Sequence, residues 1–219
     1  ATTVNGGVLA LNKSAGVNAI PAGATVAGAE LRVLGTQQIP DSAAITLNAG
    51  GVFRVHGGGS ENLNAYPTQS TASSDVQVGG TLQINGAVTQ TTGLTTLDGG
   101  LLRVGSTGTA VLNLNGGTLQ GTGAVQAQMV NNAARIDPGT NTPATAAGTI
   151  TIQGNLNTTG VIHIDLQDTS VYDKIAVVQN TNIGPISGSY IGATPTAING
   201  TVKFSGAIET GAIVGYTAP

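Results

Sequence analysis

The feature that most constrains this chain is a short unit that returns along its length. Each copy is an alternating apolar strand, a Gly-Gly corner or a close equivalent, and a second alternating strand, as in "TLNAGGVFRV" from Thr46 and "LNLNGGTLQG" from Leu112. The residues just before the second strand are spaced by 22, 22, 29, 20 and 17 residues, and they are Gly7, Ala29, Gly51, Gly80, Gly100 and Gly117. A period near 20 residues is typical of one coil of a solenoid.

Within each copy, apolar and polar residues alternate with period two, which indicates strands with one buried face. Hairpins of a β-sandwich are the alternative, since Asn-Gly pairs occur in the chain. The coil is favoured because the unit recurs in one orientation, with apolar residues at equivalent places that we expect to stack in one column: Leu9, Leu31, Phe53, Leu82, Leu102 and Leu119. We therefore predict one all-β domain over residues 1–219, a parallel β-helix of about ten or eleven coils of about 20 residues each.

Two stretches depart from the period. Residues 56–75, "HGGGSENLNAYPTQSTASSD", account for the 29-residue gap and are rich in Gly, Ser and Thr. This composition predicts a loop that projects from one coil. Residues 179–219 repeat less regularly, and we interpret them as C-terminal coils or an assembly region.

Composition excludes several classes of partner. Charged residues make up 8% of the chain and the formal net charge is −3, so no basic patch exists to neutralise nucleic-acid phosphates. The absence of cysteine excludes disulfides and thiolate metal sites. No apolar run approaches the roughly 20 residues of a membrane-spanning helix, so we expect no membrane insertion. The opening "ATTVNGG" suits a mature end left by signal-peptide cleavage, which predicts an extracellular or cell-surface protein.

Residues 115–166 carry a resemblance to a known family. The pieces Gly-Gly-Thr-Leu, Gly-Thr-Gly, Ile-Asp-Pro-Gly, Gly-Thr-Ile-Thr-Ile and Ile-His-Ile-Asp-Leu follow in this order at 116–119, 121–123, 136–139, 148–152 and 162–166. In this respect the chain resembles the autotransporter-associated beta-strand repeat of bacterial surface proteins, and looser likeness extends over about residues 6–178. The resemblance implies a right-handed parallel β-helix displayed outside a bacterial cell, often as a stalk or adhesin.

The stretch "GGTLQGTG" from Gly116 also has the glycines of a phosphate-binding loop. However, no Lys-Ser/Thr pair follows it and it opens no helix, so the cation and the helix dipole that bind phosphate are missing. A corner of the repeat explains these glycines better. We predict no cofactor.

The only local cluster of ionisable residues is "HIDLQDTSVYDK", which contains His163, Asp165, Asp168, Asp173 and Lys174. His163 and Asp165 lie two apart on an expected strand and share a face, so this cluster is the best candidate for acid–base cleavage of a polysaccharide. The competing interpretation places Asp168 and Asp173 in a turn, where Asp caps backbone groups. We favour the second interpretation. A calcium site here lacks EF-hand spacing, and His56 has no second His nearby, so we predict no metal site and no enzyme.

A solenoid with uncapped ends exposes strand edges that pair with another chain, and an open head-to-tail contact makes a filament. We therefore predict a secreted structural protein that forms a head-to-tail homopolymer in a filament, stalk or surface layer. The terminal residues expected to mediate assembly are Val4, Val8, Leu9, Leu11, Val202, Phe204, Ile208, Ile213, Val214 and Tyr216. The alternative is an adhesin or glycan-binding module that uses the loop 56–75 to contact surface glycans.

Overall fold

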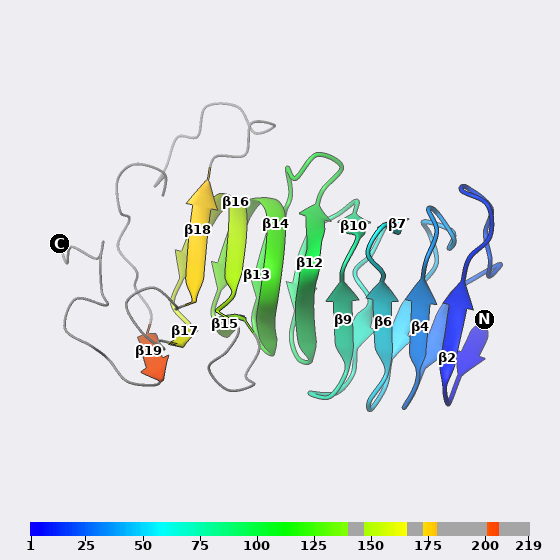
Figure 1. Ribbon diagram of the computed structural model, residues 1–219, viewed down its shortest axis with the longest axis horizontal. Coiled ribbons are helices and arrows are strands. Elements are labelled where there is room, and N and C mark those ends of the chain that lie inside the picture. The colour runs from blue at the N-terminus through cyan, green and yellow to red at the C-terminus, as the bar shows by residue number, and fades with distance from the viewer. Residues whose placement is uncertain (140–146, 166–172, 179–200, 206–219) are drawn as a thin grey trace.

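The structure is a computed structural model that describes residues 1–139, 147–165, 173–178 and 201–205. These residues form an all-β parallel solenoid of about seven turns, roughly 22 residues apart, with no helix among them. In Figure 1 the near strands run upward while the chain advances from right to left, so the solenoid is right-handed. The predicted fold class is confirmed. The described turns are fewer than ten because each is longer than 20 residues and because part of the chain lies outside the described residues.

Each regular coil has three sides, and strands on one side pair in parallel with the coils before and after. Side A contains the first parts of β12 (Leu94–Val104) and β14 (Thr118–Asn132), together with β2 (Val8–Leu11), β4 (Glu30–Val33), β6 (Val52–Val55), β9 (Asp75–Val78), β15 (Arg135–Pro138), β17 (Val161–Asp165) and β19 (Thr201–Ser205). Side B contains later parts of β12 and β14 and the first part of β16 (Thr149–Thr158), with β7 (Ser60–Leu63), β10 (Thr81–Ile84) and β18 (Lys174–Val178).

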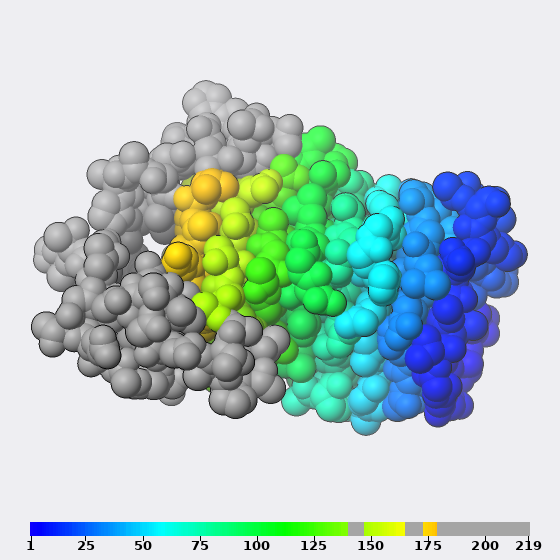
Figure 2. Space-filling model, in the orientation of Figure 1, coloured from blue at the N-terminus to red at the C-terminus, as the bar shows by residue number. Residues whose placement is uncertain are grey.

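Side C completes the triangle. Its first strands form a separate four-stranded sheet of β1 (Thr2–Val4), β3 (Ala24–Val26), β5 (Ile45–Leu47) and β8 (Thr68–Gln69). It continues with β11 (Val88–Gln90), β13 (Val111–Leu114) and the ends of β14 and β16. Successive parts of the chain follow one another as bands along the long axis (Figure 2), so each coil contacts mainly its neighbours.

Columns of inward-facing side chains fill the interior. The central column of side A is made of Leu9, Leu31, Phe53, Val76, Thr95, Leu119, Ile136 and Ile162. The corresponding column of side B is made of Glu61, Leu82, Leu102, Val125, Ile152 and Val177. Phe53, Leu82 and Leu102 are fully buried. Burial of each such side chain stabilises by about 1.5 to 3 kcal/mol before conformational entropy is subtracted.

The predicted single column was wrong in its membership. Leu82 and Leu102 follow the corner between sides A and B, whereas Leu31, Phe53 and Leu119 follow the corner between sides C and A. Both corners have the same form in sequence, an alternating strand on each side of a Gly-Gly or similar pair. The 29-residue gap arose because one kind of corner was compared with the other.

The predicted projecting loop at residues 56–75 was also wrong. This stretch contains β7 and β8, so it forms the second and third sides of a regular coil. β7 pairs with β10 in parallel, and β8 pairs with β5. Its Ser and Thr residues suggested a loop because these strands bury few large apolar residues: β7 turns Glu61 and Leu63 inward, and β8 turns Gln69 inward.

Glycines occur where successive corners stack closely. A Cβ atom at Gly80 would overlap the carbonyl oxygen of Gly59 in the preceding coil, and one at Gly121 would overlap the carbonyl oxygen of Leu97. Gly121 also has a φ of +94°, a backbone conformation that residues other than glycine rarely adopt. Glycine is therefore required at these two corners by the backbone of the preceding coil.

The first two coils lack a strand on side B. Irregular segments 12–23 and 34–44 take its place, and they stack on each other and on β7. The Gly16 N–H donates to Thr36 O at 3.0 Å, and the Ser60 N–H donates to Gly35 O at 3.1 Å. Ile20 and Ile39 are buried beneath these segments. At the N-terminal end, side B is therefore covered by irregular chain, whereas sides A and C end in strands.

Candidate functional site

The N-terminal end of the solenoid presents two strand edges, β2 on side A and β1 on side C. Each is the terminal strand of its sheet, and no described residue pairs with its outward edge. Gly7 O and Leu11 O accept hydrogen bonds from Glu30 N and Leu34 N of the second coil. Backbone groups alternate direction along a strand, so Val8 and Ala10 direct their N–H and C=O groups to the open edge.

The predicted assembly residues differ in their exposure. Val4 and Leu11 are buried against the second coil, Leu9 is half-buried, and Val8 is 52% exposed. Leu9 is the first member of the side-A column, so its outward surface has no described neighbour at the end of the solenoid. At the other end, the backbone of β19 is described but its side chains, Val202 and Phe204 among them, are not. The predicted residues Ile208, Ile213, Val214 and Tyr216 lie outside the described residues.

The outer surface of side A carries a ladder of polar contacts along the solenoid axis. It begins at the pair in which Arg32 Nε and Nη2 donate to the two Glu30 carboxylate oxygens at 2.6 and 2.8 Å. This hydrogen-bonded guanidinium lowers the pKa of Glu30. Further along, Arg54 Nε donates to Gln77 Oε1 at 2.7 Å, and Gln77 Nε2 donates to Asp75 Oδ2 at 2.7 Å.

The ladder continues over the next coils. Thr96 Oγ1 donates to Asp75 Oδ1 at 3.0 Å, and Gln120 Nε2 donates to Thr96 Oγ1 at 3.2 Å. Burial raises the pKa of Asp75 despite these donors. These side chains are already paired with one another across coils, so the ladder joins successive coils on this side.

The described members of the predicted ionisable cluster are divided between two sides of the solenoid. His163 lies on β17 of side A, where its Nδ1 is 2.9 Å from Asp137 Oδ1 of the preceding coil. Asp137 is 1% exposed and also accepts from Arg135 Nη2 at 2.7 Å. Asp173 instead precedes β18 on side B, where its Oδ1 accepts from Gly148 N at 2.7 Å.

The remaining members of the cluster are described only in part. Lys174 is exposed at the start of β18, the side chain of Asp165 is not described, and Asp168 lies outside the described residues. Asp173 caps a backbone N–H, as the turn interpretation predicts. Among the described residues, no group of three or more His, Asp or Glu side chains is placed to hold a metal ion. His56 is exposed, and its Nδ1 lies 3.0 Å from Gly57 O.

The Asp137–His163 pair was missed from the sequence because its members are 26 residues apart. That separation is about one coil, so the pair is adjacent in space although no local motif contains both residues. A search for polar residues at one-coil spacing would have found it.

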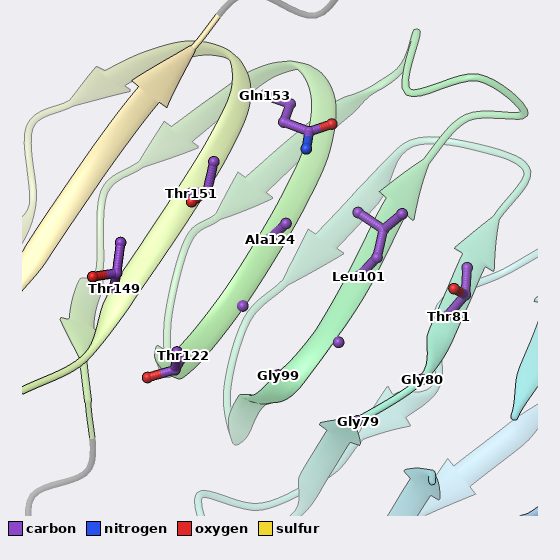
Figure 3. Close-up of a pocket in the computed structure, with 12 residues that line it drawn as sticks. Gly79, Gly80, Thr81, Gly99, Leu101, Thr122, Ala124, Thr149, Thr151 and Gln153 are labelled. Atoms are coloured by element: carbon purple, nitrogen blue, oxygen red, sulfur yellow. The ribbon is translucent and has the colours of Figure 1, made fainter. Parts of the chain in front are cut away.

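A shallow groove of about 690 Å³ crosses four coils on the outer surface where side A turns into side B (Figure 3). Its floor is made of glycines and of uncharged side chains that occupy one register position, Thr81, Leu101, Ala124 and Thr151. Thr122, Thr149 and Gln153 add hydroxyl and amide groups, and none of the lining side chains is charged. The groove therefore suits a neutral ligand rich in hydroxyl groups more than a phosphate or a carboxylate.

The segment "GGTLQGTG" runs from the corner between sides C and A, along side A, to the groove, where Thr122 and Gly123 line it. Its Gly-Gly corner does not form a phosphate loop. Gly116 N donates to Gln90 O at 3.2 Å, and Thr118 N donates to Gly93 O at 3.0 Å. These N–H groups are used to join coils, so they are not directed at a ligand. The corner interpretation is confirmed.

One carboxyl group faces the interior. Glu61 occupies the side-B column at the position of Leu82 in the next coil and is fully buried. Its Oε2 accepts from Gln38 N at 2.8 Å, and its Oε1 has no hydrogen-bond partner among the described residues. Burial raises the pKa of Glu61 to about 7.

No described helix has the length and apolar character needed to cross a membrane. Comparisons with models of protein families, with curated proteins and with solved structures find no match for this chain. The resemblance to the autotransporter-associated repeat therefore stays a prediction.

Proposed function

We propose that this protein is a structural subunit, an extracellular β-solenoid that assembles end to end into a filament, stalk or surface layer. The observation that carries the proposal is the open N-terminal end, where β2 and β1 leave the outward edges of two sheets without a described partner. Exposed strand edges pair readily with other chains, and soluble proteins usually block them with charge, proline or a covering element. Neither β1 nor β2 contains a charged residue or a proline.

The surface supports the same proposal. The polar groups on side A are engaged with neighbouring coils rather than directed at a common point, which suits a rod more than a catalyst. No acid–base pair is placed beside a described pocket in the manner of a hydrolase. Localisation outside the cell is part of the proposal, and the resemblance to the autotransporter-associated repeat supports it.

The edge can be blocked without disturbing the rest of the fold. In Ala10→Pro, the lost N–H points to the open edge, so no hydrogen bond to the second coil is removed. Ala10→Thr keeps the N–H group and is the matched control. We expect filaments of the unmodified protein and of Ala10→Thr in negative-stain electron microscopy at micromolar concentration, and mostly single rods for Ala10→Pro.

Circular dichroism of all three proteins checks that the strands are retained. If the unmodified protein stays a monodisperse monomer at high concentration, end-to-end assembly is refuted. Filaments that persist unchanged in Ala10→Pro would show that β2 is not the contact.

The groove of Figure 3 favours a second candidate function, binding of a neutral glycan. Ala124 lies on the groove floor and faces outward, so Ala124→Arg would fill the groove, whereas Thr25→Arg on side C would not. Affinity electrophoresis in gels that contain soluble neutral polysaccharides tests this function. Retardation of the unmodified protein and of Thr25→Arg, but not of Ala124→Arg, would support it, and equal mobility with and without polysaccharide would exclude it.

A further inference from the structure

We infer that the partner of the open β2 edge is β19 of a second copy, paired in parallel so that Thr201 lies beside Val8 and Phe204 lies beside Leu11. This inference rests on the proposed end-to-end assembly and specifies its contact. β2 and β19 are the two terminal strands of the same sheet, side A. In Figure 1 they lie at opposite ends of the solenoid.

The register follows from the columns of side A. Within the chain, Leu9 pairs with Leu31 at one end of the central column, and Ile162 pairs with Val202 at the other. Placing β2 after β19 in the same register sets Val202 beside Leu9. The next pair along the two strands is Lys203 and Ala10, so this register places no two like charges beside each other.

The second inward column continues in the same way. Leu11 pairs with Val33, and Ile164 pairs with Phe204. The new contact would therefore add Phe204 to the register position of Leu11. A shift of one residue would instead set the apolar positions of one strand against the outward positions of the other, so the register is specified by the buried columns.

The irregular segment 12–23 restricts where a second copy can pair. It replaces the side-B strand in the first coil, so the N-terminal end offers no strand edge on side B. Strand pairing at this end is thus confined to sides A and C, so a side-A strand of a second copy cannot pair on side B. Because β2 and β19 are different strands at opposite ends, the contact is heterologous and repeats without closing, which produces a filament of one polarity.

Disulfide cross-linking tests this pairing, because the natural chain contains no cysteine. Val8 and Thr201 occupy equivalent register positions on side A, and neighbouring parallel strands place the Cα atoms of such residues about 4.8 Å apart, within the separation that a disulfide spans. The experiment mixes Val8→Cys with Thr201→Cys under mild oxidation and measures the cross-linked dimer on non-reducing gels. The matched control mixes Val8→Cys with Val161→Cys, because Val161 is already paired on both edges, with Arg135 and Thr201.

We expect the dimer yield of the first mixture to exceed that of the control by about tenfold or more, since alignment raises the effective thiol concentration from micromolar to about millimolar. Filaments that form without this cross-link would overturn the β19–β2 pairing while leaving end-to-end assembly intact. A dominant dimer of Val8→Cys with itself would also overturn it, in favour of a head-to-head contact. Absence of both filaments and cross-links would refute the pairing and the proposed function together.

Discussion

The buried carboxyl group of Glu61 makes the stability of the N-terminal coils depend on pH. Its side chain replaces a leucine in the side-B column and is fully buried. Burial disfavours the charged form most, and donors including Gln38 N offset this only in part, so the pKa rises from 4.5 to about 7. The folded protein therefore holds this proton over a pH range in which the unfolded chain has released it.

The sign and size of the effect follow from linkage. Below pH 4.5 the group is protonated in both states and has no effect on the pH dependence. As pH rises through the interval between 4.5 and about 7, the folded state binds more protons than the unfolded state, so stability falls. A difference of roughly 2.5 pKa units corresponds to about 3 kcal/mol lost by pH 8.

Glu61→Gln is the direct test, because the amide resembles the protonated acid and keeps an acceptor for Gln38 N. We expect the variant to match the unmodified protein at pH 4 and to exceed its unfolding free energy by about 3 kcal/mol at pH 8. In urea denaturation this is a shift in midpoint of about 1 M or more. Asp98→Asn, at a carboxylate whose side chain is 65% exposed, is the control for general charge effects.

Solenoids can unfold coil by coil, so the readout must be local as well as global. Hydrogen exchange of residues 33–63 reports directly on the coils that contact Glu61. Faster exchange there at pH 8 in the unmodified protein, and not in Glu61→Gln, is the expected result. Equal pH dependence of the two proteins by both measurements would refute the assignment of a buried, proton-holding carboxyl group.

Two further substitutions test the packing. Gly80→Ala should destabilise by about 1 to 3 kcal/mol, because the added methyl group overlaps Gly59 O, whereas Gly6→Ala meets no atom within 4 Å and should be nearly neutral in the same denaturation assay. Leu102→Ala should cost about 2 to 5 kcal/mol because it leaves a cavity in the side-B column, and Leu101→Ala, on the outward face of the same strand, should cost clearly less. Equal losses within either pair would contradict the assigned orientation.

The fold class was predictable because it depends on local rules. Alternation as in Val52–Val55 identifies a strand with one buried face, and glycine between two such strands identifies a corner. A unit that recurs in one direction then requires parallel stacking. None of these steps requires information about which strands are neighbours in space.

The assignment of strands to sides was not predictable by the same means. The corner before Phe53 joins sides C and A, and the corner before Leu82 joins sides A and B, yet both read as a strand, a glycine pair and a strand. Only the pairing of the strands separates the two corners. For the same reason residues 56–75, with few large apolar residues, resemble a loop in sequence although they contain β7 and β8.

The polar contacts at the candidate sites join residues that are too far apart in sequence for a local motif search to find. In this fold several contacts between polar side chains join residues one coil apart: Arg54 with Gln77 at 23 residues, Asp75 with Thr96 at 21, and Asp137 with His163 at 26. Residues that are closer in sequence, such as His163 and Asp173, lie instead on different sides. The spacing varies because the corners differ in length, so no single period aligns all the pairs. A functional surface on a solenoid is therefore best sought down its columns, which in the described residues of side A run from β2 to β19.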